Sequence, residues 1–437
     1  MPLTDKLNDE LAKLKSISES VKLFISLNSY KRDDSPCTLD TSCIFLGLNI
    51  LYQGTSNVIR SYLEKNNDFL ATIYSSPKPL HYKSVLVTPV KYPLYKDYIK
   101  FIHNNIDNNL CITYTPKKTS DILTINTITK TRIQKWYGSS EKFYDSLRHN
   151  FSPVELSYNS FLGNGGDQWL YKFDKSKTKL RAFVTEARSD DPLEIDSKEV
   201  MMMSREGKPT FLYSFNDMTL NCLFVDIPYK NRNSMLIIKP HTIMKKDALL
   251  SFCFNYLSDG CAILDFYNKN KTKIQYDNVY LPKFHIKSQC HLDRRELFTT
   301  DRLRHLNENY VFILNSIDLN YLDKFFHNTP DFDNMFDKSH DIICDTSNQK
   351  SETRLSCFTE FICNERGTLL YDSYDDNFES FNNFLPKSNE TLDINTNFIF
   401  AVMNKDKFIQ GMGIFIGKEI KTNDAAFISA YDTITIK

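Results

Sequence analysis

The spacing of apolar residues changes once along this chain, and that change constrains the fold more than any other feature. In the first part of the chain the apolar positions follow a helical repeat, with stripes over residues 4–29, 42–64 and 122–146. From Leu156 and Tyr158 onward they alternate with polar residues, which is typical of strands with one buried face. Helices first and strands afterwards predict an α+β architecture, not a repeating βαβ fold.

Apolar runs bounded by turn residues predict the individual strands. Single strands are expected at residues 84–90, 155–161, 180–185, 200–203 and 279–286. Two hairpins are expected at residues 221–240 and 397–417, and a further helix at residues 243–257. Because proline has no N–H to donate, Pro282 implies an edge or bulge position for its strand.

The chain of 437 residues contains no internal repeat and no linker rich in Pro, Gly or Ser, so one large domain is the simplest organisation. Within the domain 1–437 we expect a mainly helical part at 1–150, a mainly sheet part at 151–363, a long exposed loop at 364–396 and a closing hairpin at 397–420. Structureless loops of that length in compact domains are usually functional or disordered.

Composition and motifs argue against several classes of function. Lys and Arg total 54 and Asp and Glu total 54, so the net charge is zero and no nucleic-acid partner is expected. The chain lacks both a long apolar run and the signatures of known catalytic motifs, so we expect no membrane partner and no enzyme activity. The chain has ten Cys but no Cys-x-x-Cys pair, so we expect reduced thiols and neither a metal nor a cofactor. Its first segment lacks the apolar core of a secretory signal, which favours a cytoplasmic location.

Six ordered motifs between residues 125 and 420 resemble the serpin family. The hairpin motif is Pro228-Tyr229-Lys230 followed by Ser234-Met235-Leu236-Ile237-Ile238. The others are Val200–Met203, the pattern Asn159…Trp169-x-x-x-Phe173, Val279–Phe284, Asn364–Thr368, and the closing pair Phe398–Phe400 with Ile414–Gly417. Each motif alone is weak, but their order and spacing together are specific.

The resemblance implies a serpin fold, in which helices pack around a large central β-sheet with smaller sheets and an exposed reactive-centre loop. It also implies that the chain is a suicide substrate for a serine-type endopeptidase, with a cysteine protease as the other target class. A protease that attacks the loop at 364–396 would form an acyl-enzyme, and the loop would then enter the sheet as an extra strand of a metastable fold. Such an inhibitor acts as a monomer without a cofactor, and family members are often extracellular.

Carried over onto matching positions, the resemblance assigns roles to individual residues. Gly367 is the hinge glycine and Thr368 is the first inserting residue. Glu365 is expected to pair with Lys283 at the breach, the top of the sheet, where Trp169 packs.

The shutter, the part of the family's sheet below the breach, departs from the family pattern here. Asn159 matches the shutter asparagine, but its usual histidine partner falls at Cys357. A thiol cannot reproduce the hydrogen bonds of an imidazole. The shutter network of this chain is therefore expected to differ.

The sequence of the loop leaves two functions open. Alternate residues of an inserting strand face the interior, and from Thr368 these would be Leu370, Asp372, Tyr374 and Asp376. Buried unpaired carboxylates oppose insertion. The alternative function is therefore a non-inhibitory serpin-fold binding protein.

The position of the scissile bond is also open. Counting forward from Gly367 by the family distance places it at Phe381-Asn382, whereas counting back from the closing hairpin places it at Lys387-Ser388. Lys387 suits a protease with an acidic specificity pocket, and an ordinary solvated lysine explains it equally well.

Overall fold

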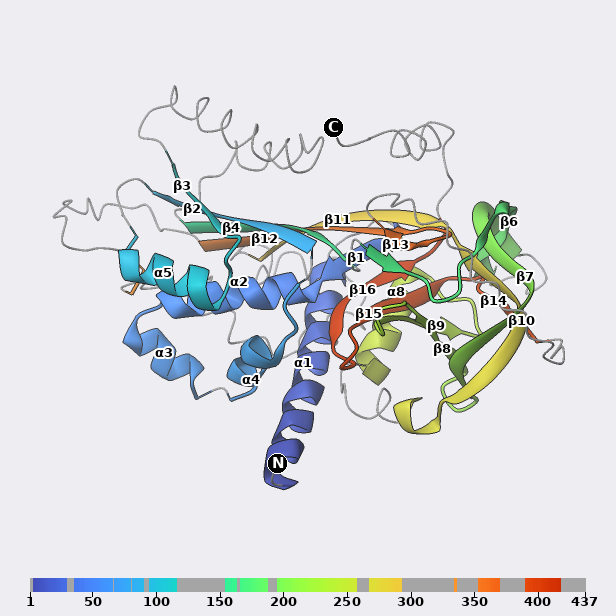
Figure 1. Ribbon diagram of the computed structural model, residues 1–437, viewed down its shortest axis with the longest axis horizontal. Helices are drawn as coiled ribbons and strands as arrows, with labels where there is room; N and C mark the ends of the chain where they lie inside the picture. Colours follow the sequence, from blue (N-terminus) through green and yellow to red (C-terminus); the bar gives the residue numbers. More distant parts are fainter. Residues whose placement is uncertain are drawn as a thin grey trace.

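The computed structural model places helices beneath a five-stranded sheet and sets a larger sheet beside both (Figure 1). The structure describes residues 3–29, 35–65, 67–79, 81–89, 94–115, 154–162, 166–187, 195–257, 267–292, 334–335, 353–369 and 390–417. The helix expected at residues 122–146 lies outside these ranges. The described elements form the α+β architecture that the sequence predicts, with helices and strands in separate layers.

Helices occupy the expected stripes at 4–29, 42–64 and 243–257, with two interruptions, and two further helices lie where the sequence predicted none. Among the described residues they include α1 (Leu3–Ser29), α2 (Thr41–Gly54), α3 (Asn57–Leu63), α4 (Asn67–Ser75), α5 (Lys96–Asn105), α8 (Lys246–Phe252) and the π-helical turn η1 (Cys253–Leu257). The helix expected at 42–64, with a break near Gly54, is divided there into two helices, because Thr55 adopts an extended conformation and α3 begins after Ser56. The helix expected at 243–257 begins three residues later and ends in η1.

The larger sheet contains the two hairpins. In the described part of the chain its strands run in the order β1-β16-β15-β9-β8-β7-β10-β14, with β6 beside β7. Their bounds are β1 (Cys37–Asp40), β6 (Asp174–Ala187), β7 (Ile195–Asp217), β8 (Cys222–Pro228), β9 (Ser234–Pro240), β10 (Thr272–Pro282), β14 (Thr391–Asp393), β15 (Phe398–Met403) and β16 (Ile409–Phe415). Both expected hairpins are present, as β8–β9 and β15–β16.

The five-stranded sheet is the central sheet of the molecule. Its order is β11-β12-β4-β2-β3, and a separate pair is formed by β13 and β5. The bounds are β2 (His81–Pro89), β3 (Cys111–Thr115), β4 (Val154–Phe161), β5 (Gly166–Gln168), β11 (Phe284–Leu292), β12 (Thr353–Cys363) and β13 (Gly367–Leu369). The helices α2 and α5 lie along one side of this sheet (Figure 1).

The strand expected at residues 279–286 is wrong as a single element. The chain leaves β10 of the larger sheet at Pro282 and enters β11 of the central sheet at Phe284. Proline lacks the N–H that would continue a ladder, so the strand ends there and Lys283 lies at the crossing between the two sheets. The Pro282 end extends beyond β14, which pairs β10 only as far as Tyr280.

Stacked aromatic rings join the two sheets. The ring of Phe284 in β11 stacks on Phe415 in β16, and the ring of Phe361 in β12 stacks on Phe400 in β15, each with centroids 4.6 Å apart. All four rings are buried. Gly413 in β16 lies against Phe400, and the ring of Phe400 occupies the space that a side chain at position 413 would need.

Asp40 is the N-cap residue of α2, and its carboxyl group is buried. Its Oδ1 accepts hydrogen bonds from the Cys43 N–H at 3.1 Å and from the Ser42 hydroxyl at 2.6 Å. Burial, and to a smaller extent the charge of Cys357, raises the pKa of Asp40 to about 7. The folded protein therefore holds a proton on this N-cap at mildly acidic pH.

We expect Gly413→Ala to lower the free energy of unfolding by about 1–3 kcal/mol, because overpacking a core displaces its neighbours. The added methyl group would meet the Phe400 ring and would lie 2.8 Å from the Cys37 carbonyl oxygen. Gly54→Ala is the control, since its nearest contact is the flexible end of Met335 at 2.5 Å. Thermal unfolding at one scan rate measures both, and equal midpoints for the two variants would contradict this packing.

We expect Asp40→Asn to flatten the pH dependence of stability. With a raised pKa, the folded state keeps a proton that the unfolded state releases, so stability falls as pH rises from about 4 to about 7. The asparagine oxygen can keep the cap hydrogen bonds but cannot titrate. The unfolding midpoint of the native chain, measured from pH 4 to 8, should therefore fall more steeply than that of Asp40→Asn, and parallel curves would contradict the assignment.

Candidate functional site

The centre of the five-stranded sheet is a boundary between two parallel strands. β12 pairs with β4 in parallel, from Thr353 opposite Val154 to Glu360 opposite Phe161. The strands outside this pair, β11 and β2, each run antiparallel to their neighbour in it. An added strand that ran opposite to both β4 and β12 would replace one parallel pairing by two antiparallel ones, which are slightly more stable per residue.

The chain turns back on itself immediately after β12. The Asn364 N–H donates to the Gly367 carbonyl at 2.9 Å, and the Gly367 N–H donates back to the Asn364 carbonyl at 3.2 Å. The Asn364 side-chain oxygen accepts from the Arg366 N–H at 3.0 Å and closes the turn. The next residues therefore run opposite to β12.

Those next residues already form a strand. β13 pairs antiparallel with β5, which follows β4, so that Gly367 lies opposite Gln168 and Thr368 opposite Asp167. Thr368 is buried, and its hydroxyl has no hydrogen-bond partner among the described residues. The expectation of an exposed loop from residue 364 is therefore wrong at both described ends, because β13 and β14 are paired strands.

Trp169 clamps the turn from the side of β5. Its indole N–H donates to the Asn364 carbonyl at 2.8 Å, and its backbone N–H donates to the Arg366 carbonyl at 2.8 Å. The ring is buried and stacks nearly parallel on Tyr229, with centroids 4.6 Å apart and an interplanar angle of 9°. Phe173 packs edge-on against the indole, at 6.3 Å between centroids.

An ion pair holds the other side of the turn. The Lys283 ammonium lies 3.1 and 3.2 Å from the two carboxylate oxygens of Glu365. Their side chains are 18% and 9% exposed, so the pair is largely shielded from water. Because Lys283 also donates its backbone N–H to the Met201 carbonyl at 2.7 Å, the pair connects the turn to the larger sheet.

The structure brings together one group of the residues that the resemblance singled out. These are Trp169, Lys283, Glu365, Gly367 and Thr368, all at the end of β12. Sequence reasoning missed Tyr229 and Asn364, which were quoted only within motifs. The signal for Tyr229 was its place in a hairpin turn beside Pro228, where an aromatic residue can pack on a neighbouring segment.

Other expected site residues lie elsewhere or outside the description. The backbone of Asn159 is in β4 opposite Phe358, while its side chain is outside the described part. The scissile-bond candidates Phe381, Asn382, Lys387 and Ser388 and the inserting residues Leu370, Asp372, Tyr374 and Asp376 also lie outside the described residues.

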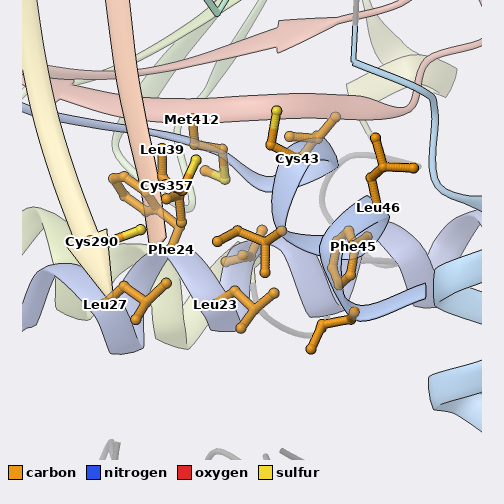
Figure 2. Packing of buried hydrophobic residues seen from close by; sticks show 14 of the residues in the cluster. Leu23, Phe24, Leu27, Leu39, Cys43, Phe45, Leu46, Cys290, Cys357 and Met412 are labelled. Atoms are coloured by element: carbon orange, nitrogen blue, oxygen red, sulfur yellow. The ribbon is translucent and has the colours of Figure 1, made fainter. Parts of the chain in front are cut away.

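Cys357 lies on the inner face of β12, toward the helices. Its Sγ is 3.9 Å from the Asp40 carbonyl oxygen, to which it donates, and 3.5 Å from the Thr359 hydroxyl. Figure 2 shows its side chain in a layer with Cys290 and Leu39, above Phe24 of α1. The expected histidine position is thus occupied by a buried thiol among mainly apolar neighbours.

Two further properties bear on what the site can hold. In the described ranges, no three side chains of His, Cys, Asp or Glu are arranged to hold a metal ion. No described helix combines the length and apolar character needed to span a bilayer.

Comparison with known proteins agrees with this geometry. A family model described as serpin (serine protease inhibitor) matches residues 76–418. A search of curated protein sequences found no match. Since the family model spans well over half of the chain, family membership is shown by sequence.

Solved structures share the fold at low identity. An insect serpin from Tenebrio molitor, described as highly specific, is 15% identical with a TM-score of 0.63, covering 96% of this chain and 100% of its own. Human thyroxine-binding globulin in complex with its hormone is 16% identical with a TM-score of 0.62, covering 93% and 99%. The thermophilic serpin tengpin in its native state is 16% identical with a TM-score of 0.63, covering 94% of each chain.

These relatives include a highly specific insect serpin and a thyroxine-binding globulin, so they establish the architecture and leave the activity open. The parallel pair β4–β12, the clamped turn that follows it and the matching family model lead to one conclusion. The chain belongs to the serpin family, the serine protease inhibitors.

Proposed function

We propose that this chain inhibits a serine-type endopeptidase as a suicide substrate, through the segment 364–396. The observation that supports this most directly is the pairing of β13, in which the buried Thr368 begins a strand beside the end of the β4–β12 boundary. The next residues need only extend that strand. No cofactor takes part, and the inhibitor acts as a monomer.

The driving force follows from the sheet. Entry of an antiparallel strand between β4 and β12 would satisfy backbone groups on both of its edges and add apolar contacts in the interior. The family mechanism uses this energy after the protease has formed an acyl-enzyme with the loop. Attack at Lys387-Ser388 would leave a longer inserting segment than attack at Phe381-Asn382.

A non-inhibitory binding protein is the second candidate, and the sequence after β13 favours it. With Thr368 buried, the alternation places Asp372 and Asp376 on the interior face of an inserted strand. Each unpaired carboxylate would cost several kcal/mol. Human thyroxine-binding globulin is a structural relative that binds a small molecule.

The decisive experiment mixes the chain with trypsin-like and chymotrypsin-like proteases and separates the products on denaturing gels. Inhibition predicts a covalent complex that survives denaturation, together with loss of protease activity. The binding-protein alternative predicts clean cleavage, with active protease recovered. In addition, a cleaved product with an inserted loop should unfold at a much higher temperature than the native chain.

Thr368→Arg should convert the inhibitor into a substrate. Arginine would place an unpaired charge at a buried position, so we expect the yield of covalent complex to fall about tenfold or more. Thr272→Arg is the control, because Thr272 is exposed on β10 and the exchange is chemically identical. If both variants form the complex equally well, Thr368 does not enter the sheet first.

Removing one partner of the Lys283–Glu365 pair should destabilise the chain more than removing both. Lys283→Met leaves the carboxylate of Glu365 shielded and unpaired, which we expect to cost about 1–3 kcal/mol of unfolding free energy. The double variant Lys283→Met with Glu365→Gln should recover more than half of that loss. Thermal unfolding of the single and double variants measures the coupling. Additive effects would mean that the pair contributes nothing of its own.

A further inference from the structure

Three buried thiols converge beneath the central sheet, and the proposed function uses none of them. Cys290 comes from β11, Cys357 from β12 and Cys43 from the first turn of α2. They are 5%, 1% and 0% exposed, and none of the three is joined in a disulfide. Figure 2 shows Cys290 and Cys357 on adjacent strands in one core layer, with Cys43 on the neighbouring helix.

The register of the sheet makes two of these residues direct partners. Cys290 lies opposite Cys357 in the antiparallel pair β11–β12, and both side chains are on the buried face. Opposite residues of an antiparallel pair have Cα atoms about 4.5 or 5.5 Å apart, depending on the hydrogen-bonding position. Disulfides span Cα separations of about 4.4–6.8 Å. A bond between these two residues therefore needs little movement of the backbone.

The surroundings of Cys357 favour loss of its proton over loss of the proton of Cys43. Hydrogen bonds from the Cys290 thiol, and then from the Cys43 thiol, hold the pKa of the Cys357 thiol well below its usual range although burial opposes this. Burial raises the pKa of Cys43 instead. Asp40 also faces this group, and with a pKa of about 7 it is protonated at mildly acidic pH. A thiolate is the form that attacks a disulfide.

We propose that Cys290 and Cys357 form a redox-reactive pair, which a low-molecular-weight disulfide such as oxidised glutathione converts into an internal disulfide. Cys357 loses its proton, and the resulting thiolate attacks one sulfur of the oxidant to form a mixed disulfide. The small thiolate that leaves takes up this proton and is released as one reduced thiol. Cys290 then loses its proton, attacks the Cys357 sulfur and releases the second thiol. Two protein thiols are thus oxidised while one small disulfide is reduced to two thiols.

The burial of the pair determines when this happens. An oxidant reaches the thiols only when the strands open locally, so the exchange is slow in the closed protein and faster under conditions that loosen the sheet. Both strands lie on the same side of the β4–β12 boundary, so the bond does not cross the place where a strand would enter. The statement about strand entry rests on the proposed function, whereas formation of the disulfide does not.

The test incubates the full chain with oxidised glutathione at increasing temperature below its unfolding midpoint. Remaining thiols are then alkylated after denaturation, and linked peptides are identified by mass spectrometry. We expect a linked peptide that contains Cys290 and Cys357. We also expect the unfolding midpoint to rise by roughly 3–6 °C because the bond closes a long loop, and dithiothreitol to reverse the rise.

Matched variants separate the pair from its neighbour. Cys290→Ala should abolish both the linked peptide and the rise in midpoint, whereas Cys43→Ala should keep both. Circular dichroism of each reduced variant checks folding, and if Cys290→Ala does not fold, the peptide map of the native chain decides. A bond from Cys357 to Cys43, or complete alkylation of all three thiols, would overturn the proposal. Failure to inhibit any protease would overturn the proposed function and leave this result unchanged.

Discussion

The parallel contact between β4 and β12 is the constraint on which the rest of the structure depends. Parallel neighbours cannot be joined by a tight turn, so the intervening chain must leave the sheet and return. Part of that chain builds the larger sheet, whose aromatic rings pack against β11 and β12 through Phe284 and Phe361. The same contact leaves a boundary that an opposed strand can fill, and the segment positioned to do so follows directly from β12.

The turn after β12 is held by interactions of two kinds. Trp169 fixes the backbone of Asn364 through its indole N–H, while Lys283 neutralises the shielded carboxylate of Glu365. The first contact comes from the segment after β5 and the second from the junction of the two sheets. Movement of the turn therefore requires changes in both sheets, which couples the start of β13 to the larger sheet.

Local pattern predicted the elements that are formed by neighbouring residues. Both hairpins were found because apolar runs flank short turns, and the stripe of α1 was found because its spacing is helical. In contrast, β1 was missed, since Cys37–Asp40 is only four residues long and pairs with β16 from the far end of the chain. The break at Pro282 was also missed, because periodicity does not reveal that a strand changes sheet.

The candidate site depended on the resemblance, since its residues come from distant segments and carry no local pattern. Lys283 and Glu365 are an ordinary lysine and glutamate until the fold brings them within 3.2 Å. The burial of Thr368 depends on the pairing of β13 with β5, which no period in the sequence announces. The resemblance predicted that Glu365 pairs with Lys283 near Trp169, but it did not predict the stacking of Trp169 on Tyr229.

Cys357 occupies the position of the family's histidine, and this difference changes the interactions that hold the lower part of the central sheet together. A histidine would contribute hydrogen bonds that break and re-form when strands separate, whereas Cys357 contributes a buried sulfur in a mainly apolar layer. Separation of β12 from its neighbours would then expose apolar surface, whose cost grows with area rather than with the number of hydrogen bonds. The centre of the sheet and the turn after β12 are therefore held by different interactions, apolar packing around Cys357 and hydrogen bonds with an ion pair at the turn.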